Sequence, residues 1–182
     1  DWTGWVKSVN PDIICLQETK AQPEQIDTHL FKEIGYETYL FSAQKKGYSS
    51  VAILTKETPN HVEYGMGNEK YDVEGRVIRA DYDTFSVISA YFPSGSSGDE
   101  RQAFKMDFLA DFQEYINELK KDYPNLIVCG DYNSVAKDMT NPPSYDQRME
   151  LPPNIFERYS NITSTWHGYS EEYEKRKNAY QE

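Results

Sequence analysis

Cysteine, histidine and long apolar runs are all scarce in this sequence. No stretch of about 18 apolar residues occurs, so we expect no helix that spans a membrane. The first residues, D-W-T-G-W, lack the basic and apolar regions of a signal peptide. Two cysteines are present, Cys15 and Cys129, and both lie in apolar runs. This placement is typical of buried free thiols in a reduced compartment, although the two could also pair.

Basic residues are also in the minority, with 19 Lys and Arg against 30 Asp and Glu. The formal net charge of −11 argues against broad electrostatic affinity for nucleic acid. It does not exclude a local basic patch, and an acidic site for a divalent metal would itself add negative charge. A length of 182 residues, with 27% charged and 38% hydrophobic side chains, indicates one soluble globular domain.

The most informative apolar run is the stretch 125–133, N-L-I-V-C-G-D-Y-N. It follows Pro124 and shows no polar alternation before Gly130, which predicts a strand buried on both faces. Side chains alternate along a strand, so Asp131 and Asn133 can project the same way from its end. A carboxylate and a carboxamide placed together can hold a metal ion, a phosphate oxygen or an attacking water. The alternative is a turn in which both merely bond the backbone.

A second buried strand is expected over residues 12–17, D-I-I-C-L-Q, and Glu18 follows it. The arrangement repeats that of the first run, because an acid again stands at the carboxyl end of an apolar strand. Ligands of α/β sheets bind at this end of the strands. Glu18 is therefore a second candidate site residue.

The remaining patterns alternate between helix and strand. Helices are predicted, from apolar spacing and stop signals, over 1–9, 23–34 and 99–121. Strands are predicted over 36–41 and 50–55 and, as an antiparallel hairpin, over 77–82 and 85–91. Such a mixture favours a layered α/β sandwich. Residues 134–182 complete no sheet that their pattern reveals.

Five short motifs occur in one order along these elements. They are L-Q-E-T-K at 16–20, G-Y-S-S-V-A-I-L-T-K at 47–56, E-G-R-V-I at 74–78, A-Y-F-P at 90–93 and G-D-Y-N at 130–133. Together they resemble the exonuclease III class of apurinic/apyrimidinic endonucleases, within the endonuclease/exonuclease/phosphatase superfamily. The resemblance runs from about Trp5 to Asn133.

The resemblance implies a four-layer α/β sandwich of the DNase I type and a Mg²⁺-dependent enzyme, with Mn²⁺ as an alternative metal. Such an enzyme cuts double-stranded DNA 5′ to an abasic site and can have 3′-5′ exonuclease activity. By the same match, Glu18 would be the metal ligand and Asp131 would orient or deprotonate the attacking water. Asn133 would hold that water or the phosphate, and the Tyr91 hydroxyl would bond the scissile phosphate.

Further residues match positions that contact DNA in the family. Arg76 and Tyr48 lie in shared motifs, although Arg76 could instead pair with Glu74 or another carboxylate. The other candidates for phosphate contacts are two basic residues one helical turn apart and a lysine close after Glu18, namely Arg101, Lys105 and Lys20. A solvated surface position is the alternative for Arg101 and Lys105.

The sequence also departs from the family at both ends. The W-N-V-N-G segment that opens the family pattern and the S-D-H motif that closes it, with its catalytic His, do not occur. His167 could replace that His, but a surface position is the alternative. We therefore expect a sandwich that is incomplete at both ends, with a core over 1–133 and a divergent tail of the same domain over 134–182.

The resemblance leads to a first hypothesis, an AP endonuclease of the exonuclease III class. It would act as a monomer in the cytoplasm, associated with the nucleoid through DNA. One alternative keeps the superfamily but changes the substrate to a lipid or another phosphoester. Another is a catalytically inactive fragment or interaction module of the same fold.

Overall fold

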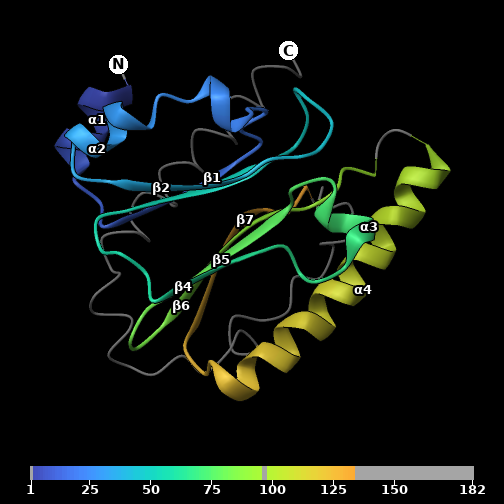
Figure 1. Cartoon of the computed structure of the whole chain (residues 1–182). Helices are drawn as coiled ribbons and strands as arrows, with labels where there is room; N and C mark the ends of the chain where they lie inside the picture. The colour runs from blue at the N-terminus through green and yellow to red at the C-terminus, as the bar shows by residue number, and fades with distance from the viewer. Residues whose placement is uncertain (1, 96–97, 134–182) are drawn as a thin grey trace, which may run out of the picture. The chain divides into compact units, whose positions relative to one another are not determined.

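The computed structural model describes residues 2–95 and 98–133 of the chain. Figure 1 labels most of its elements. The helices are α1 (Trp2–Val9), the 3₁₀ helix η1 (Pro23–Gln25), α2 (Thr28–Glu33), α3 (Glu69–Asp72) and α4 (Asp99–Asp122). The strands are β1 (Ile13–Gln17), β2 (Glu37–Phe41), β3 (Val51–Thr55), β4 (His61–Tyr64), β5 (Val77–Asp81), β6 (Ser86–Tyr91) and β7 (Leu126–Asp131).

The strands form two sheets. The first sheet has the order β1-β3-β2 and is antiparallel, whereas the second has the order β4-β5-β6-β7. Strands β5 and β6 form the predicted antiparallel hairpin, and β6 pairs with β7 in parallel. The long helix α4 makes this parallel pairing possible, since it carries the chain from the end of β6 back to the start of β7.

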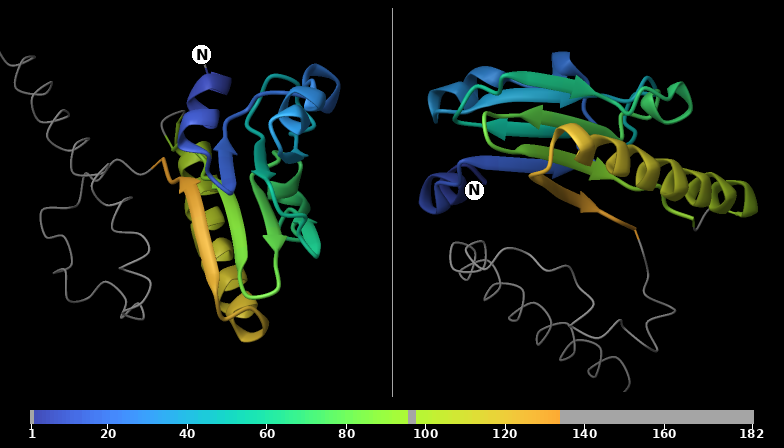
Figure 2. Two further views of the ribbon diagram at one scale, coloured as in Figure 1. Left: turned by 90° about the vertical axis from the view of Figure 1, so that its left-hand side faces the viewer. Right: turned by 90° about the horizontal axis from the view of Figure 1, so that it is seen from below.

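Three apolar clusters hold four layers together, and Figure 2 shows the layers from two sides. Val6 of α1 packs against the outer face of the first sheet, on Ala52 and Leu54 of β3. Between the sheets, β3 contributes Val51 and Ile53, which pack against side chains of β5 and β6. On the outer face of the second sheet, the predicted apolar stripe of α4 is buried through Phe108, Phe112 and Ile116. The order helix, sheet, sheet, helix confirms the predicted four-layer α/β sandwich.

Two predicted elements differ in detail. The helix predicted over 23–34 is divided into η1 and α2, because the Asp27 carboxylate accepts a hydrogen bond from the backbone nitrogen of His29 (3.1 Å) and begins a new helix there. Strand β7 is not buried on both faces, since it lies at the edge of the second sheet as described and the exposed fraction of Ile127 is 39%.

The two cysteines are free and half-buried. Cys15 lies on β1 and Cys129 on β7, and the two thiols are close enough to influence each other's pKa. Within the described chain, no helix is long and apolar enough to cross a membrane.

Candidate active site

Three strands end at one edge of the sandwich, and each end bears a predicted site residue. Glu18 follows β1 of the first sheet, while Tyr91 ends β6 and Asp131 ends β7 of the second sheet. Tyr91 and Asp131 are neighbours in the parallel register of β6 and β7. A hydrogen bond between the sheets, from Gln17 Nε2 to Ser89 Oγ (2.9 Å), fixes the end of β1 beside β6. The fold therefore brings the three side chains, which are far apart in sequence, to one edge.

Glu18 and Asn133 both interact with the Tyr91 hydroxyl at this edge. Burial raises the pKa of the Tyr91 hydroxyl, whereas the hydrogen bond with Asn133 lowers it. Because the nearby Glu18 carboxylate also raises this pKa, it remains above its ordinary value. The hydrogen bond from Lys20 holds the pKa of the Glu18 carboxyl below its ordinary value. At neutral pH the site thus offers an ionised carboxylate beside a phenol that keeps its proton.

Asp131 and Asn133 also bond the backbone of their own turn. Asp131 Oδ1 accepts a hydrogen bond from the backbone nitrogen of Asn133 (3.0 Å). Asn133 Nδ2 donates to the carbonyl oxygen of Phe92 (2.8 Å). The turn described as the alternative for these residues is therefore present. It holds both side chains in place.

The backbone of this edge is strained. Six non-glycine residues in the described part of the chain have positive φ angles, and five of them lie here, namely Glu18, Lys20, Ser49, Ser50 and Asn133. The backbone nitrogens of Thr19 and Lys20 donate to the carbonyl oxygens of Ser50 (3.2 Å) and Ser49 (2.9 Å), so two strained loops support each other. Strained residues concentrate at functional sites. Sequence reasoning missed Ser49 and Ser50, because only their backbone conformation marks them.

Four residues beside this edge form what we name the Glu74 cluster: Tyr48, Glu74, Arg76 and Arg101. Glu74 Oε2 accepts from Arg76 Nε (2.6 Å), and Glu74 Oε1 accepts from an Arg101 nitrogen (2.9 Å). Both guanidinium groups donate to the Tyr48 hydroxyl, at 3.3 and 3.1 Å. Arg76 thus does pair with Glu74, and it lies in the same cluster as two other predicted DNA contacts.

Both lysines that are predicted to contact DNA reach the edge that carries Glu18, Tyr91 and Asp131. Lys20 Nζ lies 2.9 Å from Glu18 Oε1, and Lys105 Nζ donates to the carbonyl oxygen of Asn133 (2.6 Å). Arg101 and Lys105 share a face of α4, as predicted from their spacing, but Arg101 contacts the Glu74 cluster and Lys105 contacts the end of β7. His29 and His61 are on α2 and β4, and His167 lies outside the described residues.

The donor groups fit a hard divalent cation held mainly by water. Within residues 2–95 and 98–133, no group of three or more His, Cys, Asp and Glu could hold a metal by itself. Glu18 supplies one carboxylate, and the exposed fraction of its side chain is 45%. Mg²⁺ binds proteins through one or two carboxylates and keeps several waters, whereas Zn²⁺ prefers a closed set of nitrogen and sulfur ligands. The residues are thus of the type that holds a hard divalent cation.

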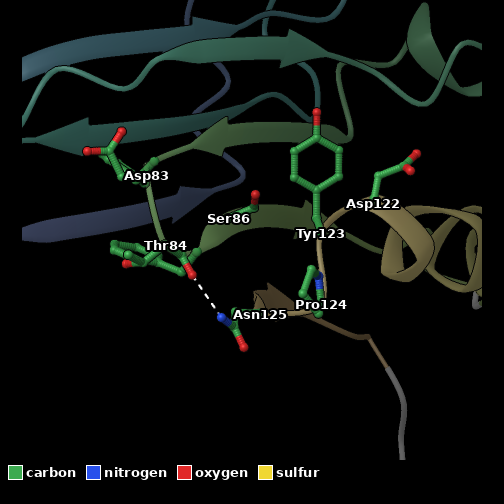
Figure 3. A pocket seen from close by; sticks show the side chains of 9 residues that line it. Asp83, Thr84, Ser86, Asp122, Tyr123, Pro124 and Asn125 are labelled. Atoms are coloured by element: carbon green, nitrogen blue, oxygen red, sulfur yellow. Dashed lines mark hydrogen bonds between the residues drawn. The ribbon is translucent and has the colours of Figure 1, made fainter.

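A separate hollow of about 330 Å³ lies at the opposite end of the same strands. Figure 3 shows its lining, which comes from the β5–β6 turn, the start of β6 and the segment between α4 and β7. None of the predicted site residues lines it. The hollow therefore belongs to a different region from the edge described above.

With the geometry established, comparison with known proteins identifies the family. The sequence profile described as "Endonuclease/Exonuclease/phosphatase family" matches residues 3–171. The chain belongs to this family. The match extends past Asn133, beyond the segment that carries the five motifs.

The relatives include DNA repair nucleases. The chain is 38% identical, over 78% of its length, to the DNA-(apurinic or apyrimidinic site) endonuclease of Dictyostelium discoideum, and 39% identical, over 78% of its length, to an exodeoxyribonuclease of Bacillus subtilis. It covers 40% and 56% of those two proteins, so it spans about half the length of the relatives it matches. These relatives confirm the resemblance stated from the five motifs.

A solved structure supports the fold. An AP endonuclease from Archaeoglobus fulgidus superposes with a TM-score of 0.65 at 31% identity, over 75% of this chain and 52% of that one. The four-layer arrangement described above is therefore that of a known nuclease fold.

Proposed function

We propose that this chain forms part of a Mg²⁺-dependent DNA repair nuclease that incises the backbone 5′ to abasic sites. The observation that supports it most is the convergence of Glu18, Tyr91, Asp131 and Asn133 on one strained edge, beside a cluster of basic and aromatic side chains. The relatives described above are named for AP endonuclease and exodeoxyribonuclease activities. A 3′-5′ exonuclease activity of the same site is part of this proposal.

Each residue has a role that its surroundings favour. The raised pKa of Tyr91 keeps its hydroxyl protonated, so it can donate a hydrogen bond to a phosphate oxygen. Asp131 can accept a proton from the attacking water, and Asn133, whose side chain is held by the hydrogen bond from Nδ2 to Phe92, can orient that water. Glu18 would hold the divalent cation, which supplies positive charge to the reacting phosphate when bound.

The DNA would be held by local positive charge despite the net charge of −11. Arg76, Arg101, Lys20 and Lys105 lie at or beside the edge, and the Tyr48 hydroxyl accepts hydrogen bonds from both arginines. Phosphate contacts of this type position a duplex without reading its sequence. A substrate chosen by a lesion rather than by sequence suits such a surface.

The test is incision of a labelled duplex that carries one abasic site, measured with Mg²⁺, with Mn²⁺ and with EDTA. We expect metal-dependent cleavage 5′ to the lesion and much slower cleavage of the undamaged duplex. Tyr91→Phe removes one hydrogen-bond donor to the phosphate and should lower kcat about 10²-fold. Absence of incision by the folded full-length protein would contradict the proposal, and hydrolysis of a lipid phosphoester instead would support the alternative substrate class.

A further inference from the structure

Glu74 lies between two guanidinium groups and is the shared partner of both. Its two carboxylate oxygens accept from Arg76 Nε at 2.6 Å and from Arg101 nitrogens at 2.9 and 3.2 Å. The exposed fraction of its side chain is 17%, against 3% for Arg76 and 27% for Arg101. One carboxylate therefore neutralises half of the positive charge in the Glu74 cluster.

The backbone around Glu74 is fixed from both sides. Glu74 follows α3, and its backbone nitrogen donates to the carbonyl oxygen of Tyr71 (3.0 Å). The next residue, Gly75, has a φ of +58°, and a Cβ there would lie 2.7 Å from Ala43 N and from Phe41 O. This turn is thus wedged against the segment after β2, and Glu74 presents its carboxylate from a rigid position.

Arg76 connects Glu74 to Tyr91, which lies at the edge that bears the predicted site residues. Its Nη1 atom donates to the carbonyl oxygen of Tyr91 (2.8 Å), and the backbone nitrogen of Tyr91 donates to the Arg76 carbonyl oxygen (2.8 Å). The Arg76 guanidinium also lies 5.2 Å from the centre of the Tyr91 ring. The guanidinium of Arg76 is thus held by Glu74 through one nitrogen and by the Tyr91 carbonyl oxygen through another, and it lies against the Tyr91 ring.

The electrostatics of the cluster agree with this arrangement. Burial acts to raise the pKa of the Glu74 carboxyl, but Arg101 and Arg76 outweigh it and leave that pKa below its ordinary value. Hydrogen bonding to Glu74 raises the pKa of Arg101 in turn. Glu74 is therefore ionised whenever the two arginines are in place.

We propose that Glu74 is a positioning residue of the nuclease site, which holds Arg76 against the Tyr91 ring, so that Tyr91 is fixed for its contact with the reacting phosphate, and which limits the free positive charge that Arg101 offers to DNA. The inference rests on the proposed nuclease function. In this arrangement Glu74 lowers the affinity for undamaged DNA, since Arg101 is held by a carboxylate rather than free for any phosphate. It raises kcat, because Tyr91 is held in one orientation.

Two variants of the full-length protein separate the charge of Glu74 from its geometry. Glu74→Gln keeps the shape and removes the charge, whereas Glu74→Asp keeps the charge and shortens the reach. Glu118→Gln is the matched control, because it also removes one carboxylate that pairs with a basic residue, at the other end of α4. Binding to undamaged duplex is measured in EDTA over a series of salt concentrations, and incision of the abasic duplex is measured with Mg²⁺.

For Glu74→Gln we expect tighter binding to undamaged DNA and a plot of log K against log salt that is steeper by about 0.9, the value of one more phosphate contact. We also expect kcat to fall at least about tenfold, since small misplacements of catalytic groups are costly. Glu74→Asp should keep the wild-type slope of log K against log salt and should have a lower kcat than the wild type. A loss of folding alone would weaken binding and incision together and would not steepen the slope.

The proposal is overturned if Glu74→Gln matches Glu118→Gln in both salt slope and kcat, or if its binding weakens. If Glu74→Gln fails to fold, the kcat of Glu74→Asp tests the proposal. A wild-type kcat in Glu74→Asp overturns the positioning role. A wild-type protein that binds and cuts no abasic duplex contradicts the proposed function instead, so the two failures are distinguished by the wild-type measurement.

Discussion

Two arginine–carboxylate pairs that lie three residues apart on the chain have opposite surroundings. Arg79 donates to both oxygens of Asp81, at 2.9 to 3.2 Å, and its guanidinium lies 4.8 Å from the centre of the Tyr123 ring. Arg79 also donates to the hydroxyl of Tyr115 (3.4 Å). Arg76, by contrast, shares its carboxylate with a second arginine, Arg101, and donates to the backbone carbonyl oxygen of Tyr91. The Arg79–Asp81 pair consists of one arginine and one carboxylate. The Arg76–Glu74 pair belongs to a network of two arginines that extends to the backbone of Tyr91.

The difference follows from where each pair lies along the strands. Arg79 and Asp81 lie on β5, toward the end of the sheet that carries the hollow of Figure 3, where β5 ends and β6 begins. Arg76 precedes β5, at the end where β6 and β7 deliver Tyr91 and Asp131. The same chemical pair therefore stabilises one end of the sandwich and organises the site at the other end. Four experiments test this contrast.

Glu18→Gln should give the largest effect and should act on activity alone. Loss of the carboxylate that would hold the metal is expected to lower kcat for incision about 10²- to 10³-fold. The free energy of unfolding should change by less than about 1 kcal/mol, because the ion pair with Lys20 is exposed. Steady-state kinetics and urea unfolding measure the two quantities. An unchanged rate at saturating Mg²⁺ would remove Glu18 from the site.

Asp81→Asn should produce the reverse result at the opposite end. It leaves the guanidinium of Arg79 buried without its charge partner, which is expected to lower the free energy of unfolding by about 3–5 kcal/mol. The incision rate of the protein that remains folded should not change. Asp122→Asn, at an exposed position at the end of α4, is the control and should have little effect. A large loss of kcat in Asp81→Asn would contradict the separation of the two ends.

Tyr82→Phe tests a smaller contribution at the same end. The Tyr82 hydroxyl donates to Thr55 Oγ1 (2.8 Å) between the two sheets, and both residues are buried. Loss of this hydrogen bond should lower the free energy of unfolding by about 1 kcal/mol. Tyr64→Phe removes a hydroxyl from a residue that is 46% exposed and should change it much less. Equal effects of the two substitutions would argue against a specific role of the buried bond.

The smallest expected effect concerns the pH dependence of the Glu74 pairs. The pKa of Glu74 is lower in the folded protein than its ordinary value of 4.5, so its ion pairs stabilise the fold fully above that value. The contribution is lost as the pH falls through the lowered folded-state pKa. The stability difference between the wild type and Glu74→Gln should therefore shrink between pH 6 and pH 3, as measured by thermal unfolding. A difference that grows toward acid pH would contradict the assignment of a lowered pKa.

Much of the edge that carries Glu18, Tyr91 and Asp131 could be predicted, because its residues lie at the ends of strands. Glu18 and Asp131 stand directly after or at the end of short apolar strands, and this pattern is visible in the sequence. The apolar stripe of α4 could be predicted for the same reason, since its spacing records which face is buried. Such features depend on residues that are near one another in the chain.

The remaining features required the tertiary structure. The strain at Ser49 and Ser50 arises because their loop supports the loop of Glu18 and Lys20, and no local preference encodes that contact. The division of 23–34 into two helices depends on one capping bond of Asp27, which competes with the helical periodicity. The exposure of Ile127 depends on the place of β7 in the order of its sheet.

The pattern of residues along the chain thus predicts a layered sandwich, the strand ends and the chemical types of the groups at the site. The pairing of each carboxylate with a particular arginine follows only from the tertiary structure. Glu74 could have paired with Arg76 alone, and it is the packing of α4 beside α3 that brings Arg101 to the same carboxylate. Ion pairs between elements are set by the positions of whole helices and sheets, because their energy depends on distances that the order of residues does not fix.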